Sequence, residues 1–176
     1  PLLANIKIIG DRWELVSQDY MPTSKKNKNL AICHDGFMCS MRRFLKGDEG
    51  LVYEMSSRLK ENPKDASFIN YVSAHNSFTL MDSVSYDRKH NEANGENNQD
   101  GSNLNYSWNC GIEGSTRKAA ILKLRRKQMK NAICFLMTAQ GTPLLLSGDE
   151  FGNSQNGNNN CYCLDDETSW IDWRLM

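Results

Sequence analysis

The sequence predicts an α/β fold with a parallel sheet, because short apolar runs alternate with segments of helical spacing. The apolar runs cover residues 6–9, 29–33, 68–72 and 142–146. Continuous runs of this kind are typical of parallel strands that are buried on both faces. Each run ends in a cluster of acids, histidines or their amides, and in a (β/α)8 barrel the reactive side chains follow the carboxyl ends of the strands. We therefore expect a partial TIM barrel whose polar clusters meet at one edge.

The segment 35–46 has the pattern of an amphipathic helix. Its apolar residues recur at spacings of four, three and one, and Gly47 follows as a stop signal. They are Phe37, Met41, Phe44 and Leu45. Arg42 and Arg43 are expected to face away from this apolar stripe.

A longer helix is predicted over residues 116–139, with Thr116 as its N-cap. One face of this segment is apolar and the opposite face is basic. The basic residues are Lys123, Arg126, Lys127 and Lys130. We interpret them as a solvated helix face. Nucleic-acid binding is disfavoured because 21 basic and 21 acidic residues give a formal net charge of zero.

Two of the polar clusters have ordinary structural interpretations. His34 and Asp35 precede the first helix, so Asp35 is interpreted as its N-cap. Asp149 and Glu150 could be a catalytic carboxylate pair, but hydrogen bonding of the loop that follows the fourth run is the favoured interpretation.

Two polar segments, 77–115 and 149–173, are too long to be ordinary connections, since loops in α/β units usually have about two to six residues. A calcium loop aligned on Gly101 fails because Ser107 stands where the closing glutamate is needed. Both segments combine amides with aromatic residues, a composition that suits a sugar better than disorder. The aromatic residues are Tyr106, Trp108, Tyr162, Trp170 and Trp173.

Composition indicates a soluble globular protein with 39% hydrophobic residues and a mean hydropathy of −0.62. No apolar run approaches the roughly 18 residues that a membrane span requires. The 6 cysteines form no zinc-type pair of C-x-x-C motifs, and Cys33, Cys39 and Cys134 lie on apolar stretches. We expect reduced thiols, a cytoplasmic location and no metal or cofactor.

The length predicts half a barrel. A complete eightfold barrel needs roughly 250 residues, whereas this chain has 176. We expect a piece of a longer protein, comprising residues 1–176 as the C-terminal half of the barrel. Half a barrel leaves strand edges and apolar helix stripes uncovered, so self-association as a homo-oligomer is expected.

Several motifs in this order resemble isoamylase-type glycogen debranching enzymes of the α-amylase clan of glycoside hydrolases. They lie at residues 71–80, 92–110, 140–152 and 157–173. The resemblance covers nearly the whole chain, from Ile6 to Trp173. It implies a retaining (β/α)8 barrel that cleaves α-1,6 branch linkages in glycogen, with this chain supplying strands five to eight.

The resemblance also identifies departures at the catalytic positions. The clan uses an aspartate nucleophile after strand four, which has no counterpart here. Asp11 stands where the family has its acid/base glutamate, and Asn76 where it has the transition-state-stabilising aspartate. Retaining hydrolysis needs two carboxyl groups about 5–5.5 Å apart. Asp11 is one methylene shorter than glutamate, and a misplacement of about 1 Å can cost roughly a hundredfold in rate. We therefore expect no hydrolysis by this chain alone.

The same resemblance suggests substrate-binding residues. His75 corresponds to a family histidine that contacts the sugar beside the cleaved bond, although a solvent-facing histidine is nearly as compatible with the pattern. Trp13 could stack on sugar or close the barrel mouth, and Trp108 is a further candidate. Three functions stay open: a portion of an active hydrolase, a non-catalytic module that binds branched α-glucan or maltooligosaccharide, and a structural association fragment.

Overall fold

The computed structural model describes residues 6–10, 29–61 and 67–176, and within them a sheet of parallel strands. The strands are β1 (Ile8–Gly10), β2 (Leu30–Cys33), β3 (Ser67–Asn70) and β4 (Thr142–Pro143), in the spatial order β1-β2-β3-β4. Each predicted apolar run overlaps one strand, so the parallel sheet is confirmed. Its assignment to strands five to eight of a barrel stays a prediction.

The fourth strand is shorter than the apolar run that predicts it. Pro143 has no N–H group to donate to a neighbouring strand, and the pairing ends one residue later, where Leu144 donates its N–H to the carbonyl oxygen of Asn70 at 2.8 Å. The remaining leucines of the run already belong to the loop. At the other edge of the sheet, Ile8 and Ile9 of β1 are 38% and 61% exposed. Self-association as a homo-oligomer stays a prediction.

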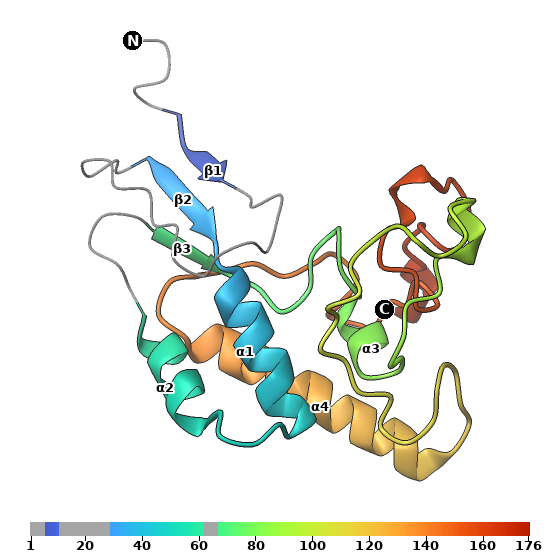
Figure 1. The fold of residues 1–176 in the computed structure, drawn as a ribbon, viewed down its shortest axis with the longest axis horizontal. Helices are drawn as coiled ribbons and strands as arrows, with labels where there is room; N and C mark the ends of the chain where they lie inside the picture. Colours follow the sequence, from blue (N-terminus) through green and yellow to red (C-terminus); the bar gives the residue numbers. More distant parts are fainter. Residues whose placement is uncertain (1–5, 11–28, 62–66) are drawn as a thin grey trace.

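Three longer helices gather beside the sheet, while the two long polar segments form the opposite side of the molecule (Figure 1). The helices are α1 (Asp35–Lys46), α2 (Val52–Lys60) and α4 (Ala119–Thr138). The polar segments contain the short helix α3 (Leu80–Ser83) and the 3-10 turns η1 (Glu92–Asn94), η2 (Cys161–Cys163) and η3 (Trp173–Leu175). Helix α2 is absent from the sequence prediction.

The predicted bounds of α1, Asp35 to Lys46 with Gly47 as the stop, are confirmed, whereas the predicted N-caps Asp35 and Thr116 are wrong. Gly47 ends α1 in the left-handed conformation, with φ 95°, which a glycine adopts without strain. Asp35 is the first helical residue and His34 occupies the N-cap position; the Asp35 carboxylate accepts a hydrogen bond from the Tyr71 hydroxyl at 2.5 Å. Helix α4 begins after Lys118, and Thr116 accepts from the Lys118 N–H at 3.2 Å in the turn before it.

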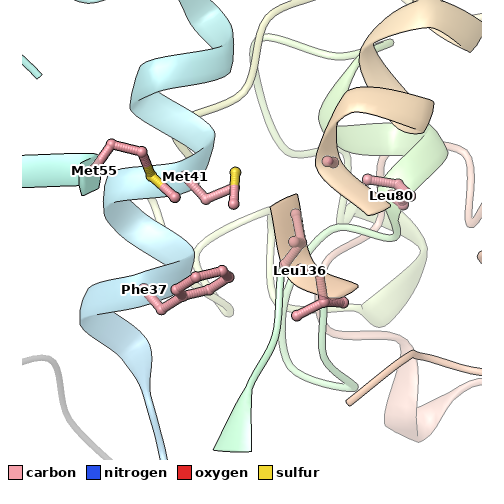
Figure 2. Close-up of a cluster of buried hydrophobic side chains, with 7 residues drawn as sticks. Phe37, Met41, Met55, Leu80 and Leu136 are labelled. Carbon is pink, nitrogen blue, oxygen red and sulfur yellow. The ribbon is translucent and has the colours of Figure 1, made fainter. Parts of the chain in front are cut away.

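The apolar core lies where α1, α2, α3 and α4 meet. Its fully buried residues are Phe37, Met41, Met55, Val72, Leu80, Ala132 and Leu136. Figure 2 shows Phe37 and Met41 of α1 facing Leu136 of α4, with Met55 reaching in from the other side. The rings of Phe44 and Phe135 add an edge-to-face contact with centroids 5.6 Å apart. This core also supports the first polar segment, because it includes Leu80 of α3.

The outer face of α4 is basic, as the sequence predicts. Lys123, Arg126, Lys127 and Lys130 are all exposed. The same helix contains two surprises: Arg125 is buried, and Cys134 is exposed although the sequence places it among small buried hydrophobes. Cys33 and Cys39 are half-buried, and all six cysteines are free thiols.

Candidate functional site

The candidate site is a tight turn at the carboxyl end of β3. Ser77 closes this turn by donating its N–H to the carbonyl oxygen of Ala74 at 3.1 Å, and its hydroxyl accepts from the Ala74 N–H at 3.0 Å. The closed turn leaves His75 and Asn76 exposed at its tip. The structure therefore brings these two predicted site residues together at the edge of the sheet where the polar clusters were expected.

Arg42 hydrogen-bonds to the main chain of the turn from within the protein. The prediction that this residue faces outward is therefore wrong. Its side chain is buried, and its guanidinium group donates to the carbonyl oxygens of Val72 at 2.7 Å and Phe78 at 2.9 Å. It also donates to the hydroxyl of Ser77 at 3.3 Å and the carbonyl oxygen of Asn105 at 3.1 Å. Burial lowers the Arg42 pKa to about 10, so the group stays charged at neutral pH. The spacing of Arg42 from Met38 and Leu45 is the signal that could have predicted its burial.

Asp149, in the loop that follows β4, also hydrogen-bonds to residues on either side of the turn. Its carboxylate accepts from the Ser73 hydroxyl and from the Leu80 N–H, the latter at 2.8 Å. Burial raises the pKa of Asp149 to about 6. Glu150 is exposed and accepts from the Gly148 N–H at 2.9 Å. Glu150 hydrogen-bonds within the loop that follows β4, as the favoured interpretation has it, whereas the Asp149 carboxylate binds the segment that follows β3. Because its side chain is 3% exposed, Asp149 gives no access to a ligand.

His34 belongs to the packing between β2, β3 and the helices. Its ring stacks on Phe68 with centroids 4.2 Å apart, and its Nδ1 donates to the side-chain oxygen of Asn70 at 3.0 Å. Its Nε2 lies 3.4 Å from the Arg58 guanidinium and 3.5 Å from the Glu61 carboxylate. Burial lowers the His34 pKa, which favours the neutral ring in this arrangement.

The amides of the two long segments bind one another. We call this set the amide lattice; it consists of Asn91, Asn94, Asn158, Asn159 and Asn160. Asn91 donates to the side-chain oxygen of Asn159 at 2.9 Å, and Asn159 returns a main-chain hydrogen bond to Asn91 at 3.0 Å. Asn158 donates to Asn94 at 2.7 Å. A Cβ on Gly101 would collide with the Asn159 side chain, so only glycine fits beside the lattice. Asn91, Asn158 and Asn159 are buried and their amides are hydrogen-bonded by protein, so these three are not available to a sugar.

Buried cations stabilise the irregular chain around the lattice. The ammonium group of Lys89 donates to the carbonyl oxygens of Asp100 at 2.7 Å and Gly101 at 3.2 Å. Arg125 donates to the carbonyl oxygens of Gly114 at 2.7 Å, Asn109 at 3.1 Å and Ile112. We call Arg42, Lys89 and Arg125 the carbonyl-binding cations. They supply the donors that helices and sheets would otherwise provide to these main-chain groups.

Asp82 of α3 also links the two long polar segments. It is fully buried and accepts from the Ser154 hydroxyl at 2.5 Å and the Gln155 N–H at 2.8 Å. Burial raises the Asp82 pKa. Asp82 thereby fastens the segment that follows β4 to the segment that follows β3.

The other predicted site residues lie away from the turn tip or outside the described residues. Trp108 is half-buried beside a cavity of about 20 Å³ that is also lined by Arg42, Tyr106 and residues of α1 and α4. That volume has room for about one water molecule and none for a sugar ring. Asp11 and Trp13 fall outside the residues that the structure describes.

The described residues contain no group of three His, Cys, Asp or Glu side chains arranged to hold a metal ion. Among these residues there is also no helix with the length and apolar character needed to cross a membrane.

Comparison with known proteins relates the chain to bacterial glycogen debranching proteins. It is 41% identical, over its whole length, to a glycogen operon protein GlgX homolog of Mycobacterium tuberculosis strain H37Rv. It is 42% identical over 99% of its length to a glycogen debranching enzyme of Erwinia tasmaniensis, and 40% identical over 98% to a GlgX homolog of Haemophilus influenzae. The chain spans 25% to 28% of the length of these relatives. No protein-family model matches it. The resemblance to glycogen debranching enzymes is confirmed.

Replacing Arg42 with methionine should destabilise the chain by about 3–5 kcal/mol, because it leaves buried carbonyl oxygens without donors. Urea unfolding followed by circular dichroism measures this loss. The matched control is Arg43→Met, which removes a half-exposed ion pair to Asp48 at 3.2 Å and should change stability by less than about 1 kcal/mol. Equal losses in both variants would contradict the role of Arg42.

The raised pKa of Asp149 gives stability a pH dependence of defined sign. Between about pH 4 and pH 6 the folded chain binds more protons at this group than the unfolded chain, so the free energy of unfolding falls as pH rises, by about 3 kcal/mol in total. Asp149→Asn should lack this fall, whereas Glu150→Gln should keep the wild-type profile. Urea unfolding at pH 4.5 and pH 7 measures the difference, and parallel profiles for wild type and Asp149→Asn would refute it.

Proposed function

We propose that this chain belongs to an isoamylase-type barrel that binds branched α-glucan without cleaving it. The chain is homologous to about a quarter of the length of bacterial glycogen debranching proteins. The observation that carries this proposal is the exposed His75–Asn76 turn at the carboxyl edge of the sheet, in a chain with 40–42% identity to those proteins along almost its entire length. Reactive side chains of (β/α) barrels occupy this edge. The position therefore suits a substrate-binding turn.

Rigid support beneath the turn favours binding. Arg42 and Asp149 hold the main chain on either side of the exposed pair, so the positions from which His75 and Asn76 project are fixed. A preorganised main chain loses little conformational freedom when a ligand binds. An imidazole and an amide can both donate and accept hydrogen bonds, which matches the hydroxyl groups of a sugar.

The chemistry of Asn76 argues against cleavage. The family aspartate at this position carries a charge that stabilises the cationic transition state, and an amide of the same shape carries none. Removing one preorganised stabilising group typically costs about 10²–10³-fold in rate. Asp11 adds a second loss by the family comparison, since its carboxyl group is one methylene short of the glutamate that protonates the leaving oxygen.

An active debranching hydrolase is the second candidate, and the name of the Erwinia tasmaniensis relative, glycogen debranching enzyme, favours it. The two candidates differ in turnover and not in ligand. Binding and hydrolysis therefore have to be measured separately.

Binding is tested by isothermal titration with a branched maltooligosaccharide at millimolar concentration. We expect measurable heat, and an approximately tenfold weaker affinity for His75→Ala, which removes one hydrogen-bonding side chain. His90→Ala is the matched control, because His90 is also exposed but lies on another loop, 3.4 Å from Glu113. An absence of heat with the wild type, or equal weakening by both substitutions, would overturn the proposed binding turn.

Inactivity is tested by the release of reducing sugar from glycogen or pullulan. We expect no release above the blank from the wild-type chain, because the amide of Asn76 cannot supply the missing charge. A debranching hydrolase assayed in parallel controls for substrate quality. Turnover above the blank would decide for the second candidate and against the interpretation of Asn76.

A further inference from the structure

The outer face of α4 carries a row of exposed cations. Four basic residues, related by spacings of three or four positions, lie within an arc of about 100° on one face of the helix. They extend over about 10 Å along the helix axis. We call them the basic stripe; it consists of Lys123, Arg126, Lys127 and Lys130. Because these side chains share one face, the stripe is a compact positively charged surface.

No acidic side chain neutralises the basic stripe within the part of the chain that the structure describes. The ion pairs of the described residues lie elsewhere, and residues 114–148 contain no aspartate or glutamate. Arg125 of the same helix differs from the stripe, because it is buried and donates to the carbonyl oxygen of Gly114 at 2.7 Å. The exposed cations of the stripe therefore attract a negatively charged surface.

The segment that follows β4 carries a surface of the opposite charge. Residues 149–176 are acidic, with a single basic residue, Arg174, which is paired with Asp172 at 2.7 Å. Three consecutive acids of this segment are exposed, and a turn begins there, in which the carbonyl oxygen of Asp166 accepts from the Ser169 N–H at 3.0 Å. Consecutive Cα atoms are about 3.8 Å apart, so the three acids span at most about 8 Å. We call them the acidic turn; it consists of Asp165, Asp166 and Glu167.

The basic stripe and the acidic turn are complementary in charge and similar in length. They are not joined to each other within one molecule, because no ion pair of the described residues connects them. Figure 1 shows α4 along one border of the molecule and the last residues of the chain in a different part of it. The formal net charge of the chain is zero, so two copies do not repel each other at long range. One copy can therefore offer its acidic turn to the basic stripe of another.

We propose that a second copy of the chain docks on α4, with the acidic turn of one copy bound to the basic stripe of the next. This contact joins two different surfaces, so each copy can take part in two contacts. It is separate from association through the sheet edge, which would depend on apolar side chains such as Ile9. Exposed ion pairs are individually weak, so the association is reversible. It does not depend on the proposed glucan binding.

Sedimentation velocity over a series of protein concentrations tests the contact through its salt dependence. The Debye length falls from about 30 Å at 0.01 M salt to about 3 Å at 1 M salt. We expect the association constant of the wild-type chain to fall about tenfold or more between these two conditions. Association through the apolar sheet edge would not weaken in this way. A wild type that stays monomeric at low salt, or that associates equally in both conditions, would overturn the proposal.

Two uncharged double variants separate the two halves of the contact. Lys123→Gln/Lys127→Gln removes half of the basic stripe. Asp165→Asn/Glu167→Gln removes two charges of the acidic turn and keeps an oxygen that can accept from the Trp170 indole N–H. Each variant alone should associate about tenfold more weakly than the wild type at low salt. An equimolar mixture should regain association, because the intact stripe of one variant meets the intact acidic turn of the other.

Lys60→Gln/Arg88→Gln is the matched control. It removes two exposed cations outside the stripe and changes the net charge by the same amount, so its association constant should stay within about twofold of the wild type. Circular dichroism checks that each variant is folded. Equal weakening by the control would show an effect of net charge alone and would refute the docking surface. Wild-type association by either uncharged variant, or a mixture that does not recover, would refute it as well.

Discussion

The guanidinium group of Arg42 is the interaction on which the exposed turn depends. It binds main-chain carbonyl oxygens on both sides of the turn, from Val72 to Phe78, and a third at Asn105 in the long segment that follows. Irregular chain has no regular partner for its carbonyl groups, and leaving them buried and unpaired costs about 1–3 kcal/mol each. One planar side chain with five donors meets this need at several points at once. Lys89 and Arg125 bind main-chain carbonyl oxygens in the same way elsewhere in the long segments.

Buried hydrogen-bonding groups hold the main chain of the turn and thereby position the exposed pair His75 and Asn76. His75 and Asn76 receive their position from buried groups beneath them, and those groups come from α1 and from the loop after β4. Binding at this tip and rigidity below it are separate properties of the molecule. The chemistry depends on the exposed pair alone, and an amide in the place of a carboxylate can alter the reaction while leaving the support unchanged.

Helices and strands that have a spacing of apolar residues could be predicted from the sequence. Hydrogen bonds between side chains and main-chain groups could not. The four apolar runs predict the positions of the strands, although only β3 is mostly buried. The stripe from Phe37 to Leu45 predicts α1, since burial of one helix face imposes a period that the sequence displays. An apolar residue also recurs every four positions at Leu51, Met55 and Leu59, so α2 could have been predicted as well. The spacing of Arg42 from Met38 and Leu45 could have predicted its burial, but its partners are carbonyl oxygens, which carry no sequence signal. The amides of the long segments were visible, but nothing in their order shows that they bind each other and not a sugar.

The amide lattice has a consequence for how this sequence can change. Asn91 and Asn159 each donate a hydrogen bond with the amide nitrogen and accept one with the amide oxygen. Aspartate has the same shape but no donor. The exchange of asparagine for aspartate, nearly neutral on most surfaces, is therefore closed to evolution inside the lattice. Spontaneous deamidation of an ageing protein makes the same exchange without a mutation, so hydrolytic damage there would loosen the long segments from each other.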